Sequence, residues 1–155
     1  MLFLDTSVLI KFYFNEAGSD AIIARSTAPN QLLAASVLSF AEVHSAMARK
    51  YRERQINQAD LSNLRKVFER DWEDLVHEVE INLQTMAALP GLVEQYPLKA
   101  ADAIQLSAVL WLKNNMEMGK YSRAAKVLEF CVSDQTLADC GRKCGLVVFN
   151  PEEEC

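Results

Sequence analysis

Short apolar runs alternate with longer amphipathic stretches along the chain. Four runs have the length and continuity of buried strands: MLFL at residues 1–4, LLAAS at Leu32–Ser36, KVLEFCV at Lys126–Val132 and GLVVF at Gly145–Phe149. Such continuous apolar runs are typical of parallel strands covered on both faces, because a strand with one face in water alternates apolar and polar residues. A fifth candidate strand, VHEVEI at Val76–Ile81, does alternate.

The stretches between these runs predict helices. They are Thr6–Phe14, Ser19–Ser26, Ser39–Glu53, Gln58–Asp74, Asn82–Gln95 with an interruption at Pro90-Gly91, Ala101–Lys113 and Gln135–Lys143. In the fourth of them, Leu61, Leu64 and Phe68 recur on one face at helical spacing. Alternating strands and helices predict an α/β fold, a three-layer α/β/α sandwich around a central, mainly parallel sheet of four to five strands.

The length of 155 residues fits a single domain over 1–155, with enough chain to bury a core. Within this domain we expect the helical pair at about 39–74 to protrude, its apolar face serving either core packing or a partner protein. No apolar run approaches the roughly 20 residues that span a bilayer. No basic leader precedes Asp5, so we expect a cytoplasmic protein without a membrane partner.

The four cysteines all lie in the last quarter of the chain, at Cys131, Cys140, Cys144 and Cys155. Cys140 and Cys144 are one helical turn apart, but neither histidine, His44 or His77, has zinc-site spacing to them. We therefore expect reduced, partly buried thiols.

The formal net charge of −5 argues against a broad basic surface that coats nucleic acid. Local basic patches remain compatible with it. Two clusters stand out, the first formed by Arg49, Lys50, Arg52 and Arg54 and the second by Lys120, Arg123 and Lys126. A solvated helix end explains either cluster equally well.

Four acidic residues stand where predicted strands end or predicted helices begin. Asp5 and Asp134 each follow a strand, where open α/β sheets bind ligands, but each also suits a helix N-cap. Glu42 closes the sequence SFAE, the signature of a capping box that begins at Ser39. Asp102 lies in a first helical turn, where an acid complements the helix dipole.

Taken together, the four acids suggest a second interpretation. If they converge on one edge of the sheet, their mutual repulsion raises their pKa values unless a cation neutralises them. Clusters of carboxylate oxygens suit Mg²⁺ or Mn²⁺. The metal-site hypothesis therefore depends on whether the four side chains meet.

Four sequence blocks occur in the order typical of one protein family: LDTSVLIKFY, SFAEVHSAM, LKAADAIQLSAVL and CVSDQTLADCGRKCGLVVFNP. They resemble the blocks of a PIN domain, and the chain length resembles that of VapC-type toxin ribonucleases of prokaryotic toxin–antitoxin systems. The resemblance implies an α/β/α sandwich and a Mg²⁺- or Mn²⁺-dependent endoribonuclease. Hydrolysis of RNA by metal-activated water in line with the leaving group is expected to leave a 5′-phosphate and a 3′-hydroxyl.

The resemblance also implies roles for individual residues. Asp5 is the expected central metal ligand, with Glu42 and Asp102 completing the shell and Asp134 binding a second ion or acting through water. Ser7 is expected to orient these carboxylates by hydrogen bonding, although it also suits a first helical turn. A homodimer and a small antitoxin that blocks the acidic site are the partners implied, beside the RNA substrate.

Two features depart from the family pattern. Val132 stands two residues before Asp134, where many relatives carry Thr or Ser. The segment Asn114–Ala125 is long for a connection and either shapes access to the site or is a surface insertion.

Three alternatives compete with a nuclease. A catalytically inactive PIN scaffold that binds RNA or protein is the first, and retention of all four acids argues against it. A phosphoacceptor receiver domain needs adjacent acids after its first strand and a late lysine, which LDTS and VSDQ do not supply. A haloacid-type phosphatase needs an acid where Ser7 stands.

Overall fold

The computed structural model of the protein describes residues 1–117 and 127–153. Its centre is a parallel five-stranded sheet in the order β3-β2-β1-β4-β5. The strands are β1 (Leu2–Leu4), β2 (Leu33–Ser36), β3 (Val76–Val79), β4 (Glu129–Cys131) and β5 (Val147–Phe149). All five predicted strands are present. The alternating one, β3, lies at an edge of the sheet, where two of its four residues are exposed.

Helices connect consecutive strands. They are α1 (Thr6–Leu9) with the 3-10 turn η1 (Ile10–Phe12), α2 (Ser19–Ser26), α3 (Val37–Arg52), α4 (Gln58–Leu75), α5 (Leu89–Gln95), α6 (Ala100–Glu117) and α7 (Gln135–Lys143). The helix predicted over Asn82–Gln95 is wrong in its first half. Asn82 forms turns there by accepting from the backbone of Gln84 and Thr85. Pro90 lies in the first turn of α5 and does not interrupt it, because proline is tolerated there, where its missing N–H has no intrahelical partner.

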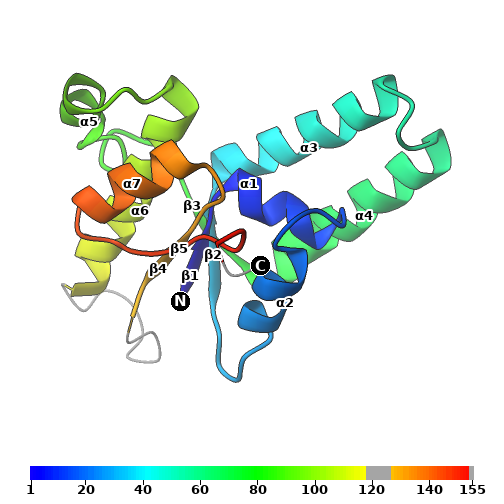
Figure 1. The fold of residues 1–155 in the computed structure, drawn as a ribbon, viewed down its shortest axis with the longest axis horizontal. Helices are drawn as coiled ribbons and strands as arrows, with labels where there is room; N and C mark the ends of the chain where they lie inside the picture. The colour runs from blue at the N-terminus through cyan, green and yellow to red at the C-terminus, as the bar shows by residue number, and fades with distance from the viewer. Residues whose placement is uncertain (118–126, 154–155) are drawn as a thin grey trace.

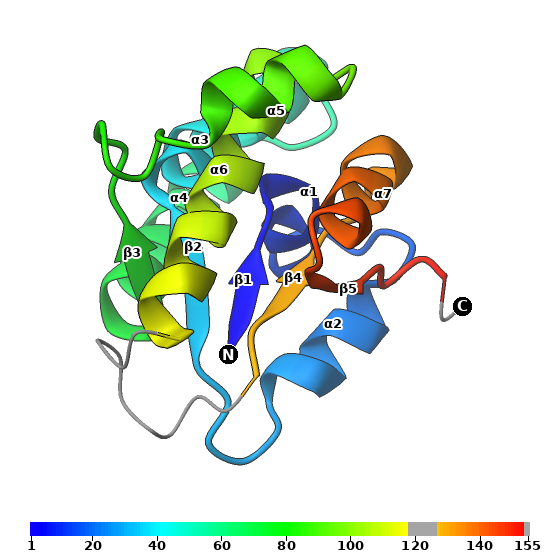
Figure 2. The ribbon, with the colours of Figure 1, turned by 90° about the vertical axis from the view of Figure 1, so that its left-hand side faces the viewer.

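The helices form two layers on opposite faces of the sheet, as Figure 1 shows with α5, α6 and α7 on the left and α1 to α4 on the right. The residues of β1 divide between these layers, because successive side chains of a strand point to opposite faces. Phe3 packs with the core beneath α6 and α7, whereas Leu2 and Leu4 pack with the core beneath α1 to α4. The predicted three-layer α/β/α sandwich is confirmed. Figure 2 gives a second view of it, with α6 in front of the sheet.

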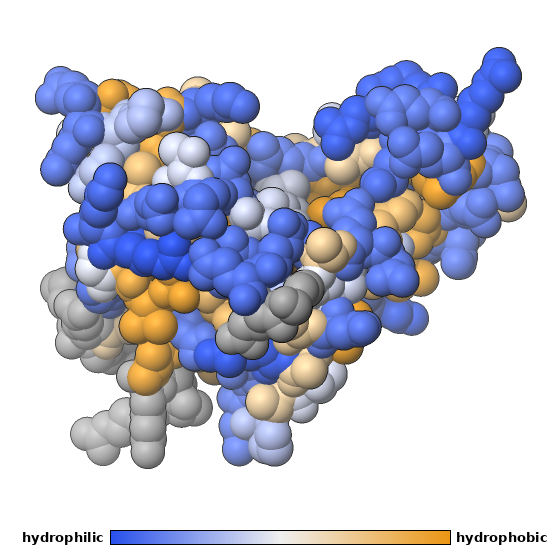
Figure 3. All heavy atoms as spheres, in the orientation of Figure 1, coloured by the Kyte–Doolittle hydropathy of each residue, from blue (hydrophilic) through white to orange (hydrophobic). Residues whose placement is uncertain are grey.

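The helices α3 and α4 form an antiparallel hairpin that extends away from the sheet (Figure 1). Aromatic rings hold the pair together: Phe40 of α3 stacks on Phe68 of α4 with ring centroids 5.4 Å apart, and Trp72 packs edge-on against both. The apolar face predicted on α4 is therefore used largely for packing. Hydrophilic residues cover the far end of the hairpin (Figure 3).

Several sequence predictions concern residues outside the described part of the chain. Lys120, Arg123 and Lys126 lie there, as do residues 118–125 of the long connection and Cys155. Cys131, Cys140 and Cys144 are free thiols, as expected. Among residues 1–117 and 127–153, no helix is long and apolar enough to cross a membrane.

Candidate active site

Asp5 lies at the carboxyl end of the central strand β1 and is 7% exposed. It is the N-cap of α1, where its Oδ2 accepts hydrogen bonds from the backbone N–H of Ser7 at 2.9 Å and from the Ser7 hydroxyl at 2.6 Å. The Ser7 hydroxyl oxygen in turn accepts from the backbone N–H of Ser133 at 3.0 Å, and so ties this turn to the loop after β4. Asp5 is thus fixed in orientation by its own helix and by the neighbouring strand.

Glu42 lies in the second turn of α3, and the predicted capping box at Ser39 is wrong. The helix follows β2 so directly that its N-cap is Ser36, whose hydroxyl accepts from the Leu38 backbone at 3.2 Å. Ser39 is therefore inside the helix and fully buried. This frees Glu42 from a capping role and turns it toward α1 and α6.

Glu42 makes its hydrogen bonds to residues that are distant in sequence. Its Oε2 accepts a short hydrogen bond from the Thr6 hydroxyl and another from Gln105 Nε2, 3.2 Å away. Gln105 also donates to Ser39 Oγ at 2.8 Å. None of Thr6, Ser39 and Gln105 was predicted as a site residue from the sequence. One available signal was a glutamine in a mostly apolar helix, three residues after Asp102 and hence on the same helical face.

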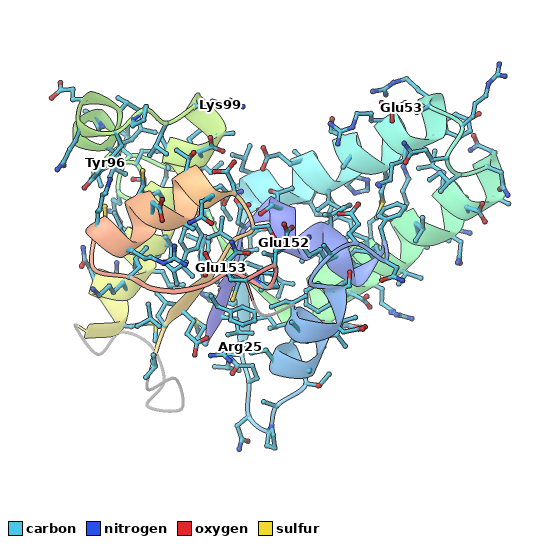
Figure 4. The ribbon with its side chains drawn as sticks, viewed as in Figure 1. Arg25, Glu53, Tyr96, Lys99, Glu152 and Glu153 are labelled. Atoms are coloured by element: carbon cyan, nitrogen blue, oxygen red, sulfur yellow. The ribbon has the colours of Figure 1, made fainter. Side chains whose placement is uncertain are left out.

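Asp102 and Asp134 begin the two helices that follow. Asp102 is in the first turn of α6, next to Lys99, which Figure 4 labels at the start of that helix. Asp134 is exposed and caps α7 by accepting from the Leu137 backbone at 2.8 Å. The capping roles that the sequence suggested for Asp5 and Asp134 are therefore real.

Burial and neighbouring carboxylates raise the pKa values of two of the acids, Asp5 and Asp102. Burial raises the pKa of Asp5 from its ordinary value of 3.8 to about 6; the Ser7 hydrogen bonds oppose this shift and the charge of Glu42 adds to it. The pKa of Asp102 is raised first by burial and then by the charge of Asp134, with Glu42 contributing and Lys99 opposing. The parallel order β2-β1-β4 brings the starts of α1, α3 and α7, and with them Asp5, Glu42 and Asp134, to the carboxyl edge of the sheet, where the charges of Glu42 and Asp134 also act on Asp102.

The donor set fits a hard divalent cation in chemistry, because every member is a carboxylate. Its geometry is not that of a closed site: among residues 1–117 and 127–153, no three His, Cys, Asp or Glu side chains are grouped closely enough to hold a metal ion as they stand. The same result leaves Cys140 and Cys144 without zinc-site partners among the described residues. A cation at the acidic edge would therefore require the carboxylates to rearrange around it.

A model of one protein family, described as the PIN domain, matches residues 2–113. The chain belongs to the PIN domain family. The matched segment contains Asp5, Glu42 and Asp102, whereas Asp134 lies beyond it. The predicted family is thus confirmed, and three of the four acids lie within the part of the chain that carries it.

Two named relatives are ribonucleases VapC45 and VapC49 of Mycobacterium tuberculosis. Each is 27% identical over 113 residues, which cover 71% of this chain and 75% of the relative. Solved structures with a similar fold include a toxin–antitoxin complex from Klebsiella pneumoniae, with 18% identity and a TM-score of 0.62, and FitAcB from Neisseria gonorrhoeae, with 13% identity and a TM-score of 0.63. Both cover 97% of this PIN domain chain and 98% of the neighbour. At such identities the two structures show a shared fold.

Proposed function

We propose that this PIN domain protein is a Mg²⁺- or Mn²⁺-dependent endoribonuclease that acts as the toxin of a toxin–antitoxin pair. The observation that carries the proposal is that the parallel order β2-β1-β4 brings Asp5, Glu42 and Asp134 to one edge of the sheet, where the charges of Glu42 and Asp134 also raise the pKa of Asp102. Two relatives named as ribonucleases support the reaction class. Because the proposed substrate is RNA inside the cell, we also propose that the protein acts in the cytoplasm.

The residues of the chain supply binding and orientation. Ser7 holds one oxygen of Asp5, and Thr6 with Gln105 holds one oxygen of Glu42, so the rearrangement that a cation requires starts from two oriented carboxylates. With its pKa near 6, Asp5 is ionised at neutral pH and able to bind a cation. When bound, a divalent ion supplies the chemistry these side chains lack, activating water and stabilising charge on the phosphate.

Substrate binding by an acidic protein requires local positive charge. The basic cluster at the end of α3 provides it: Arg49, Arg52 and Arg54 are exposed, and within the described residues no hydrogen bond or ion pair engages their side chains. Lys50, by contrast, is paired with Glu16 at 3.0 Å. We assign the three arginines to contacts with RNA phosphates.

The names of solved structures with a similar fold support the proposed partner proteins. One is named as a toxin–antitoxin complex, and another is VapBC2 from Rickettsia felis bound to a promoter DNA fragment, with a TM-score of 0.62. These names support a small antitoxin that covers the acidic edge. A homodimer is part of the same proposal. The alternative is an inactive PIN scaffold that binds RNA or protein, and the absence of a closed metal site among the described residues is the observation in its favour.

Cleavage of structured RNAs by the purified protein tests the proposal. Wild type with Mg²⁺ or Mn²⁺ is expected to cleave, and EDTA or Asp5→Asn is expected to abolish cleavage, while Asp20→Asn, an exposed acid on α2, leaves it intact. Activity that survives both EDTA and Asp5→Asn would overturn the metal-carboxylate mechanism. A wild type that cleaves no RNA but co-purifies with a small protein would favour the scaffold.

A further inference from the structure

Gln105 is a deeply buried polar side chain beside the acidic edge, with 1% of its surface exposed. Its Nε2 lies 2.8 Å from Ser39 Oγ, 3.2 Å from Thr6 Oγ1 and 3.2 Å from Glu42 Oε2. The four residues come from α1, α3 and α6, and the two farthest apart, Thr6 and Gln105, are separated by 99 positions. Thr6, Ser39 and Gln105 form a polar cradle around one oxygen of the Glu42 carboxylate.

The available hydrogens determine how this cradle is connected. A primary amide carries two hydrogens and a hydroxyl carries one. The Thr6 hydrogen is directed to Glu42, because a carboxylate is a stronger acceptor than a hydroxyl. The hydrogen between the Thr6 and Ser39 oxygens, 3.1 Å apart, then comes from Ser39, and the two amide hydrogens of Gln105 reach Ser39 and Glu42. Two donors thus converge on Glu42 Oε2.

The orientation of the Gln105 amide follows from the same count of hydrogens. The reversed amide would place its oxygen 3.2 Å from the carboxylate, with two acceptors facing each other. With the nitrogen facing Glu42, Gln105 Oε1 is buried, and no described residue donates to it. An unpaired buried carbonyl is destabilising, and an apolar side chain of the same length would avoid that penalty.

We propose that Gln105 is a positioning residue for Glu42, one that orients the carboxylate for cation binding and contributes little to stability. The proposal rests on the proposed metal-dependent function. All three donors in the cradle are neutral, so they orient Glu42 without cancelling its negative charge. A lysine or arginine in the same place would also orient Glu42, but it would cancel the negative charge that attracts a cation. Groups that hydrogen-bond to metal ligands typically change metal affinity by about 10- to 100-fold when removed.

The test measures Mn²⁺ affinity of the purified full-length chain by isothermal titration calorimetry, together with the melting temperature. Gln105→Met keeps the length of the side chain and removes both donors. We expect it to bind Mn²⁺ about 10- to 100-fold more weakly while melting at the wild-type temperature or above. Thr6→Val removes the second donor to the same oxygen from a half-buried position and is expected to act in the same direction.

Ser107→Ala is the matched control on the same helix. Ser107 is fully buried and donates to the Thr85 carbonyl at 2.7 Å, away from the cradle. Its loss is expected to lower the melting temperature and to leave Mn²⁺ affinity unchanged. Equal weakening of Mn²⁺ binding by Ser107→Ala and Gln105→Met would mean a general loosening of α6, and would overturn the proposal.

Asp5→Asn separates this inference from the function on which it rests. If Asp5→Asn abolishes Mn²⁺ binding but Gln105→Met and Thr6→Val both bind as wild type does, the positioning role is wrong and the metal site stands. If none of the three changes Mn²⁺ affinity, the metal site itself is wrong. Should Gln105→Met fail to fold, as judged by circular dichroism, the result with Thr6→Val decides.

Discussion

The two ends of α3 carry polar residues in opposite environments. Near its start, Ser39 and Glu42 are held by hydrogen bonds from distant parts of the chain. Near its end, Arg49 and Arg52, with Arg54 in the following turn, have exposed side chains that no hydrogen bond or ion pair engages within the described residues. Figure 4 labels Glu53 at the far end of the hairpin and Lys99 beside the start of α6, and the two labelled residues lie well apart.

This difference in environment predicts a difference in how each end acts. Buried charges interact strongly, since little water screens them, and their effect depends on orientation. Exposed charges are screened within about 8–10 Å at physiological ionic strength, and their effect depends mainly on their number. The start of α3 with Glu42, the acidic end, is therefore expected to determine whether the reaction occurs. The opposite end with Arg49, Arg52 and Arg54, the arginine end, is expected to determine how tightly RNA binds.

The largest expected effect is on catalysis. Asp102→Asn removes one of the coupled charges from a half-buried position and is expected to lower RNA cleavage by at least about 100-fold, since a metal ligand contributes more than the groups around it. Expression in a host is the measurement: wild type arrests growth and Asp102→Asn relieves the arrest. Glu73→Gln on the exposed side of α4 is the control and should still arrest. Arrest by Asp102→Asn at equal protein level would contradict the role of the acidic end.

The next effect is on stability. Here a substitution at the acidic edge is expected to stabilise the protein, whereas the previous one impairs cleavage. The Asp5 pKa is raised from 3.8 to about 6 in the folded chain, chiefly by burial. The folded state therefore holds this proton more tightly, and the stability associated with it is lost as pH rises through 6. Asp5→Asn removes the buried charge, so we expect it to raise the free energy of unfolding by about 2–3 kcal/mol at pH 7.5 in EDTA.

Urea denaturation at two pH values tests this expectation. Well below pH 3.8 the Asp5 carboxyl is protonated in both folded and unfolded chains, so the difference between wild type and Asp5→Asn should shrink toward zero. Asp139→Asn, on the exposed side of α7, serves as control with little change at either pH. A destabilised Asp5→Asn at pH 7.5 would show that burial of this charge is compensated in the folded chain.

A smaller effect is expected at the arginine end. Replacing Arg49, Arg52 and Arg54 together by alanine should weaken RNA binding and reduce the slope of log K against log salt by about 2, because each phosphate that is no longer neutralised lowers the slope by roughly 0.7. Fluorescence anisotropy with a labelled RNA over a salt series measures both quantities. The pair Arg142→Ala and Lys143→Ala, at the end of α7, removes two positive charges elsewhere and controls in part for the change in net charge. An unchanged slope in the triple variant would locate the RNA elsewhere.

The smallest effect concerns the turn that presents these arginines. Asn57 caps α4 in a capping box with Asp60, in which each side chain accepts from the other's backbone. Asn57→Ala is expected to lower the free energy of unfolding by about 1 kcal/mol, a typical value for loss of an N-cap. Thermal denaturation and RNA cleavage measured together should show the first changed and the second not. A loss of cleavage would mean that the two ends of the hairpin are coupled.

Local signals in the sequence predicted most of the elements. The bounds predicted for α2 and α7 agree with the structure, because each follows from short-range periodicity and a clear start or stop. The two errors were also local. A Ser-x-x-Glu pattern was interpreted as a cap although β2 leads directly into α3, and Asn82–Gln95 was treated as one helix although its first half consists of side-chain-capped turns.

The sequence by itself determined the strands, the family and the four acids, since these depend on residue type and order along the chain. Only the tertiary structure decided that the acids share one edge and that Thr6, Ser39 and Gln105 surround Glu42. The hydrogen bonds of this cradle join positions 33 to 66 residues apart. Such pairs meet because the parallel order β2-β1-β4 brings α1, α3 and α6 to the same end of the sheet, and no local pattern records that arrangement.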